Sequence, residues 1–248
     1  MKALVLKKIP FGETDWVVHF LLENGRILSG FAPGGRRSKK RFPHQFPFTA
    51  IFDLEWSRTP SKEKLSRIQR CELLEFYPEL ASDLVNLGRW ATILEWVLRD
   101  EGGEFEFHDV YSVMRTLEQS SSGPMAYHFF FLEQMKRHGV PPQMEDCLVC
   151  GERLAQEEPG IFSIVDGGVA HQSCSDGILL RSSTLDFMRR CLNDRETASE
   201  EEFFLEKETY DELDSVSLPY LEYQLGLPLK SRRFYEQVKR GQAPKVPG

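Results

Sequence analysis

The strongest constraint on the fold of this chain is a change in hydrophobic period at Tyr77 and Pro78. Before these residues, apolar side chains alternate with polar ones, which is the two-residue period of strands with one buried face. After them, apolar residues return every three or four positions, which is the period of an amphipathic helix. The sequence therefore predicts an α+β fold, with a β-rich part first and a helical part second.

The first part of the chain predicts five short strands. The clearest covers residues 46–56, where six apolar side chains fall on one face. Asn24 and Gly25 predict a tight turn between two of the other strands. These other strands are expected at residues 3–7, 16–22, 26–32 and 64–74. Five strands without a long helix between them fit a small closed barrel, so we expect an OB-fold domain over residues 1–76.

The second part opens with an apolar stripe on a helix that ends near Asp100. The stripe consists of Leu80, Leu84, Leu87, Ala91, Leu94 and Leu98. Further helices are predicted around residues 110–117, 125–138, 184–192 and 218–225, with a last one after Leu229. We expect these helices to form one α-helical domain over residues 77–248, with a small metal-binding knuckle inserted at residues 145–177.

A cluster of cations lies between the third and fourth predicted strands. Its members are Arg36, Arg37, Lys39, Lys40 and Arg41, in a chain whose net charge is −7. Because like charges repel, we expect this segment not to fold on itself and to form a mobile loop. A phosphate backbone would relieve the repulsion and release counterions, so the cluster predicts salt-sensitive binding of nucleic acid. Phe42 and Trp16 are candidates for stacking on bases, whereas the aromatic residues of the fourth strand are expected to pack in the core.

The distribution of charge makes the first part of the chain basic and the remainder acidic. Residues 1–70 hold 14 Lys and Arg against 6 Asp and Glu, whereas the remaining 178 residues hold 17 against 32. Because most of the chain is acidic, we expect that the whole molecule does not wrap nucleic acid. The acidic part leaves a surface suited to other partners. The alternative interpretation of the cationic cluster is a solvated charge run without a partner, or a targeting patch.

Three of the five cysteines and one histidine form two pairs with metal-ligand spacing. Cys147 pairs with Cys150, and His171 pairs with Cys174, which is typical of a structural zinc site with three thiolates and one imidazole. All four positions would come from the protein, so none remains for a reactive water. The alternatives are four free side chains without metal, or His171 as a bystander. Residues 162–169 predict a small hairpin between the two pairs.

Motifs for several other kinds of chemistry are missing from the sequence. It contains no Gly-x-x-x-x-Gly-Lys-Ser/Thr loop, no Gly-x-Gly-x-x-Gly and no Gly-x-Ser-x-Gly elbow. Charge returns at Lys7 before the apolar region of a signal peptide is established, and no apolar run approaches the about 20 residues of a membrane span. An odd number of cysteines also suits a reducing compartment. We therefore expect a cytoplasmic protein that binds rather than catalyses.

Several short motifs occur in a characteristic order. They are residues 12–15 after the first strand, residues 34–39 after the third, residues 77–80 opening the helical part, residues 138–142 before the first metal pair, and Gly167 with Gly168 before the second. Their order and spacing resemble those of the RecO family of bacterial recombination and repair proteins, over nearly the whole chain. Where that family often has a fourth cysteine, this chain has His171, and imidazole is an equally competent zinc ligand.

The resemblance implies an N-terminal OB-fold, a helical domain and a structural zinc. It also implies a nucleoid-associated mediator of the RecF pathway that binds single- and double-stranded DNA and anneals complementary strands. With RecR, such a mediator helps RecA to replace single-strand-binding protein. The residues implied in DNA contact are Arg36, Arg37, Lys39, Lys40 and Arg41, and those implied in zinc binding are Cys147, Cys150, His171 and Cys174. The alternatives are a protein-recruiting adaptor with little DNA affinity, and a zinc hydrolase, which would need a solvent ligand on the metal.

Overall fold

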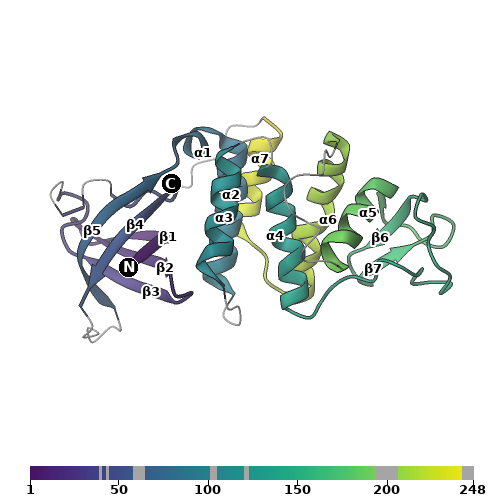
Figure 1. Cartoon of the computed structure of the whole chain (residues 1–248), viewed down its shortest axis with the longest axis horizontal. Helices are drawn as coiled ribbons and strands as arrows, with labels where there is room; N and C mark the ends of the chain where they lie inside the picture. The colour runs from purple at the N-terminus through teal and green to yellow at the C-terminus, as the bar shows by residue number, and fades with distance from the viewer. Residues whose placement is uncertain are drawn as a thin grey trace. The chain divides into compact units, whose positions relative to one another are not determined.

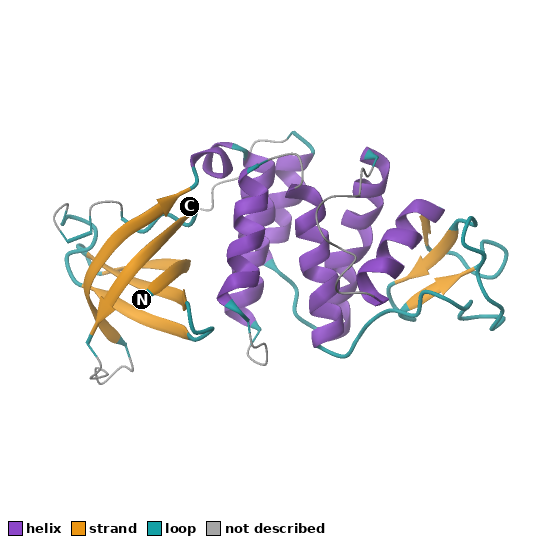
Figure 2. Ribbon diagram, in the orientation of Figure 1, coloured by secondary structure: helices purple, strands orange, loops and turns teal. Residues whose placement is uncertain are grey.

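The computed structural model describes residues 1–38, 41–42, 45–57, 65–100, 105–119, 123–193 and 206–241. Contacts between residues divide the chain into two compact units. The first comprises Met1–Ser120 together with Leu229–Gly248, and the second comprises Ser121–Pro228. Each unit has a sheet of its own, as the two groups of strands in Figure 2 show. The division into domains at residue 76, with an insertion at residues 145–177, stays a prediction.

Five strands of the first unit close into a barrel (Figure 1). They are β1 (Lys2–Phe11), β2 (Asp15–Leu22), β3 (Ile27–Ala32), β4 (Ala50–Trp56) and β5 (Ser66–Phe76). Their order around the barrel is β1-β2-β3-β5-β4, and pairing of β1 with β4 closes the ring. Closure removes the free edges of the sheet. The predicted OB-like barrel at the start of an α+β fold is confirmed.

The barrel core is built from apolar side chains that all five strands turn to the inside. Phe20, Phe52 and Ile68 come from three different strands and are fully or almost fully buried. Gly30 leaves the space that Ile68 fills, because a Cβ at residue 30 would lie 2.4 Å from the Ile68 Cδ1 atom. Burial of each such large apolar side chain contributes about 1.5–3 kcal/mol. The expectation that the aromatic residues of this region pack in the core is confirmed for Phe52.

The fourth strand is shorter than predicted. It begins at Ala50 rather than at residue 46. Gln45 and Phe46 have φ angles of 51° and 58°, which lie in the left-handed region and outside the range of a strand. The Phe46 ring is nevertheless buried, with its centroid 5.2 Å from that of Phe42. Aromatic spacing therefore predicted the burial of this residue but not its backbone conformation.

Helices complete the first unit. They are α1 (Pro78–Ser82), α2 (Leu84–Arg99), α3 (Phe107–Glu118) and α7 (Lys230–Lys239). The single predicted stripe from Leu80 to Leu98 is split, because Asp83 is extended and its carboxylate caps α2 by accepting from the N–H groups of Val85 and Asn86. Trp90 of α2 is fully buried, and its Nε1–H donates to the Phe48 carbonyl at 2.9 Å. This bond ties α2 to the barrel.

The second unit combines helices with a small sheet. Its elements are α4 (Gly123–Arg137), α5 (Ser182–Asn193), α6 (Lys207–Leu225), β6 (Gly160–Ser163), β7 (Gly168–Ala170) and β8 (Ile178–Leu180). The β6–β7 pairing confirms the predicted hairpin, and β8 adds a strand that the sequence did not indicate. His128 of α4 is fully buried, and its Nδ1 lies 2.9 Å from the Ser217 hydroxyl of α6. This histidine is a core residue.

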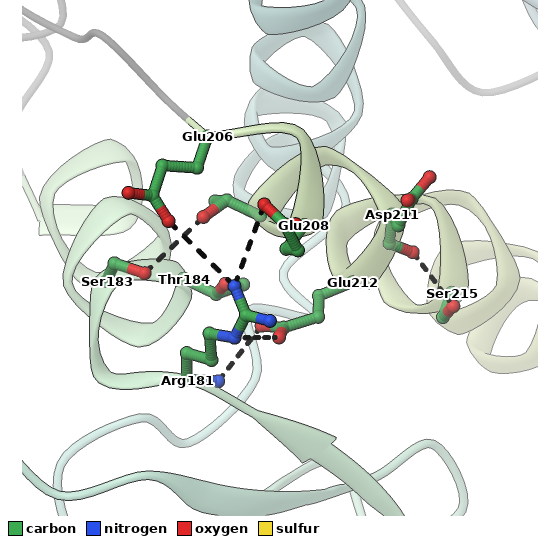
Figure 3. Close-up of polar contacts among 9 residues, drawn as sticks. Arg181, Ser183, Thr184, Glu206, Glu208, Asp211, Glu212 and Ser215 are labelled. Carbon is green, nitrogen blue, oxygen red and sulfur yellow. Dashed lines mark hydrogen bonds and ion pairs between the residues drawn. The ribbon is translucent and has the colours of Figure 1, made fainter.

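Arg181 joins the start of α5 to the first turns of α6 (Figure 3). Its guanidinium lies 3.4 Å from a carboxylate oxygen of Glu212 and 3.9 Å from those of Glu206 and Glu208. Glu212 also accepts from the backbone N–H of Arg181 at 2.9 Å and from the hydroxyl of Thr184. Glu212 therefore satisfies donors at the start of α5 while it holds the arginine, whereas the side chains of Glu206 and Glu208 contact the guanidinium alone among the described residues.

Candidate nucleic-acid interface and metal centre

The basic loop, defined as residues 33–42, follows β3 directly. Of its five predicted contact residues, Arg36, Arg37 and Arg41 are described, whereas Lys39 and Lys40 lie outside the described residues. The described part folds on itself: the Ser38 N–H donates to the Gly34 carbonyl at 2.8 Å, and the Phe42 N–H donates to the Ser38 carbonyl at 3.1 Å. For this part, the prediction of a loop that does not fold on itself is wrong.

Two arginines of the basic loop donate hydrogen bonds to carbonyl oxygens, and these bonds offset the repulsion between the positive charges of the loop. Arg41 Nη2 donates to the Pro33 carbonyl at 2.8 Å, and Arg36 Nη1 donates to the Gly12 carbonyl at 3.3 Å. Arg37 is exposed, and among the described residues its side chain has no hydrogen-bond or ion-pair partner. The loop is therefore held by two of its own cations, while a third stands free for an anion.

The turn between β1 and β2 fixes the start of the basic loop. Asp15 accepts from the Gly34 N–H at 2.8 Å and from the Thr14 hydroxyl at 2.7 Å, and these bonds lower the pKa of Asp15. The Arg36 N–H donates to the Thr14 carbonyl at 2.8 Å. Gly34 has a φ of 69°, a conformation that glycine adopts without steric cost. Sequence reasoning gave Asp15 no role, and its place in the motif of residues 12–15 was the only signal.

The structure changes the roles expected for two aromatic residues. Phe42 is only 2% exposed, so the prediction that it stacks on bases is wrong; it anchors the basic loop in the barrel core. Trp16 is partly buried, and two cations lie close to its ring: Lys8 Nζ is 5.4 Å and the Arg36 guanidinium 5.6 Å from the centroid. An aromatic face attracts cations at this distance. Trp16 therefore contacts one cation of β1 and one of the basic loop.

The four predicted metal ligands converge in the second unit. The ligand atoms of Cys147, Cys150, His171 and Cys174 all lie within 4.8 Å of one another. Around a tetrahedral zinc with Zn–S bonds of about 2.3 Å, neighbouring sulfurs lie about 3.8 Å apart, so four such groups fit one ion. The cluster could therefore bind a metal ion through a closed set of three thiolates and one imidazole.

Backbone geometry brings the two metal pairs together and favours the thiolate form. Gly151 has a φ of 77°, and its N–H donates to the Cys147 carbonyl at 2.9 Å, which closes the first turn. The Leu148 N–H donates to the Val169 carbonyl at 2.9 Å, so the first pair is attached to strand β7. Burial by itself would raise the pKa of Cys147, but N–H donors, including that of His171, lower it to about 6. A thiolate is the form that binds metal.

Comparison with known proteins identifies the family. The family model described as "Recombination protein O N terminal" matches residues 1–77, and the one described as "Recombination protein O C terminal" matches residues 92–233. The two models together match most of a chain in which a barrel is followed by helices and a Cys₃His cluster, and their family is one of DNA recombination and repair proteins. The chain belongs to the RecO family.

Curated relatives agree with this assignment. Each of three is named DNA repair protein RecO. The relative from Syntrophus aciditrophicus is 23% identical over 96% of this chain and 95% of its own length. That from Anaeromyxobacter sp. strain K is 26% identical over 96% of both chains, and that from Maridesulfovibrio salexigens is 28% identical over 71% of this chain and 73% of its own.

Within the described residues, no helix is both long and apolar enough to cross a membrane.

Proposed function

We propose that this chain is a DNA-binding mediator of recombinational repair in the RecF pathway. It binds single- and double-stranded DNA and anneals complementary strands. With RecR, it assists RecA in replacing single-strand-binding protein on gapped DNA. It acts as a binding protein rather than as an enzyme, and it works in the cytoplasm in association with the nucleoid. Family membership supports this proposal, and the repair role is the part that the names of its relatives share.

The observation that carries the proposal is that Arg36, Arg37 and Arg41 lie in the folded, described part of one loop that follows strand β3 of a closed barrel. A folded loop holds guanidinium groups at fixed spacing, so less conformational freedom is lost when they meet phosphates. Arg37 is exposed and free to pair with a phosphate oxygen. Contacts of this kind read the backbone and not the bases, which suits a protein that must act on any sequence.

The metal centre supports the second unit in this proposal. Zinc is the ion we assign to Cys147, Cys150, His171 and Cys174, because three thiolates and one imidazole are a common structural zinc set. The bound ion would fix the turns that carry these ligands against the small sheet. With all four positions supplied by protein, its role is structural.

The test is DNA binding by a variant with alanine at Arg36, Arg37, Lys39, Lys40 and Arg41. Its affinity for labelled single- and double-stranded DNA should fall, and the slope of log K against log salt should become flatter by about 0.7 to 0.9 for each phosphate that the variant no longer neutralises. A matched pair of double variants isolates the contribution of the basic loop to DNA affinity. Arg36 and Arg37 are replaced together in one variant, and the exposed Arg233 and Arg240 are replaced together in the control. Equal affinities of wild type and the loop variants would overturn the site assignment.

Strand annealing then separates a mediator from an adaptor. Annealing of complementary strands is measured at two salt concentrations, with and without single-strand-binding protein. A mediator accelerates annealing, and the loop variant loses this effect. If the wild-type chain binds RecR or single-strand-binding protein but has negligible DNA affinity at physiological salt, it is an adaptor and the proposal fails.

A further inference from the structure

Residues 45–46, called the strained return below, follow the basic loop and carry backbone strain. Among the described residues, Gln45 and Phe46 are the two non-glycine residues with positive φ, and they are consecutive. A side chain at such angles crowds the backbone, so the conformation persists only where the surroundings hold it. Burial of the Phe46 ring in the barrel core holds the second residue. The first residue, Gln45, is exposed and must be held in another way.

Two hydrogen bonds hold Gln45. Lys8 Nζ donates to the Gln45 carbonyl at 3.2 Å, and Gln45 Nε2 donates to the Arg36 carbonyl at 3.4 Å. These two bonds connect strand β1 to the strained return, and the strained return to the basic loop. The carbonyl of Arg36 lies in the loop itself, so a displacement of Gln45 would be transmitted to the cations.

Lys8 is fixed in place rather than free in solvent. Its Nζ atom lies 5.4 Å from the centroid of the Trp16 ring and 5.3 Å from that of Phe48, and two aromatic rings near one ammonium favour its charge. Burial lowers the pKa of Lys8, which agrees with an ammonium that is partly withdrawn from water. The Trp16 ring that contacts Lys8 also contacts Arg36. Lys8 is therefore linked to the basic loop a second time, because Lys8 and Arg36 both contact the Trp16 indole.

Building on the DNA-binding function proposed above, we propose that Lys8 and Gln45 are positioning residues of the nucleic-acid interface. They hold the strained return of the basic loop, so that Arg36 and its neighbours stand at a fixed spacing before a phosphate backbone arrives. Lys8 acts on the loop through Gln45 and Trp16 and is not itself a phosphate ligand. Its ammonium is engaged by a carbonyl and two rings, unlike the exposed Arg37.

The experiment measures binding of the full chain to labelled oligothymidine and to a duplex over a series of salt concentrations. Lys8→Met removes the donor while keeping an unbranched side chain. Gln45→Gly removes the amide and, because glycine tolerates positive φ, relieves the strain. Each variant should bind about fivefold more weakly, since the loop loses its pre-organisation. The salt slope should stay at the wild-type value, and the thermal midpoint of Gln45→Gly should be equal or higher.

A matched control is Lys7→Met, which removes the same charge from an exposed neighbour on β1 and should change affinity less than about twofold. Wild-type affinity in both Lys8→Met and Gln45→Gly would overturn the proposal. A salt slope flatter by about 0.7 to 0.9 in Lys8→Met would identify Lys8 as a direct phosphate ligand and also overturn it. Absence of DNA binding by the wild type would instead remove the proposed function, and this inference with it.

Discussion

The carboxylate of Glu95 accepts two hydrogen bonds from Ser231, one from the backbone N–H and one from the hydroxyl, each 2.7 Å long. The N–H of Lys230 adds a third at 3.2 Å. Glu95 lies on α2 and these donors open α7, so one carboxylate caps a helix 136 residues further along the chain. A negative charge at the start of a helix also interacts favourably with the helix dipole. Glu95 therefore anchors the start of α7 to α2 within the first unit.

Replacement of this carboxylate should loosen α7. Glu95→Gln keeps an acceptor oxygen but loses the charge, and we expect the free energy of unfolding to fall by about 1 kcal/mol, as for other helix caps. Burial by itself would raise the pKa of Glu95, but the bonds from Ser231 and Lys230, together with nearby Arg99, outweigh it and lower the pKa below its ordinary value of 4.5. Urea unfolding of both proteins at neutral pH measures the difference.

The lowered pKa of Glu95 fixes the sign of the pH dependence. Its contribution is fully present above the unfolded-state pKa and is lost as the pH falls through the lower folded-state pKa. The difference in stability between wild type and Glu95→Gln should therefore shrink at acidic pH. A difference that stays constant down to about pH 3 would contradict the cap.

Asp15 should matter for DNA binding although it is negatively charged. In Asp15→Ala, the Gly34 N–H loses its acceptor and the basic loop is less ordered, so DNA affinity should fall about three- to tenfold. Glu13→Ala is the matched control, because it removes the same charge from an exposed residue of the same turn. Electrostatics alone would make both variants bind DNA more tightly. Tighter binding by Asp15→Ala would show that the turn does not hold the loop.

The metal centre predicts one zinc per chain. Cys147→Ser should lower the zinc content measured by elemental analysis and should destabilise the second unit, because metal binding and local folding are coupled. Cys191→Ala is the control, since Cys191 is a buried thiol outside the cluster and its loss should leave the zinc content unchanged. A zinc-free preparation with unaltered stability would refute a structural role.

The glutamates around Arg181 should differ in their contributions to stability. Among the described residues, the Glu208 side chain contacts only the half-exposed guanidinium, so Glu208→Gln should cost less than about 0.5 kcal/mol. Glu212 also accepts from the Arg181 N–H and the Thr184 hydroxyl, so Glu212→Ala should cost about 1–3 kcal/mol by leaving these donors without their acceptor. Denaturant unfolding compares the two variants. Equal effects would mean that the bonds from the Arg181 N–H and the Thr184 hydroxyl add nothing to the stability beyond the ion pairs.

Sequence patterns predicted those features that local chemistry determines. Alternation and turn residues indicated the barrel, and ligand spacing indicated that Cys147 and His171 belong to one site. The predictions failed where contacts between segments distant in the sequence determine the structure. The burial of Phe42 depends on its contact with Phe46, and the described part of the basic loop is held by Asp15 at the start of β2. Charge repulsion alone suggested an open loop, because the carbonyl oxygens that accept from its arginines cannot be read from composition.

The return of α7 to the first unit has a consequence for synthesis on the ribosome. The residues from Ser121 to Pro228 must all be translated before the helix that packs on α2 exists. At about 5–20 residues per second, this delay lasts about 5–20 s. Throughout that interval α2 lacks its partner helix, and the face of α2 that α7 covers is open to chaperones or to misassembly. The residues of α7 thus complete a unit whose other described elements are all translated before Ser121.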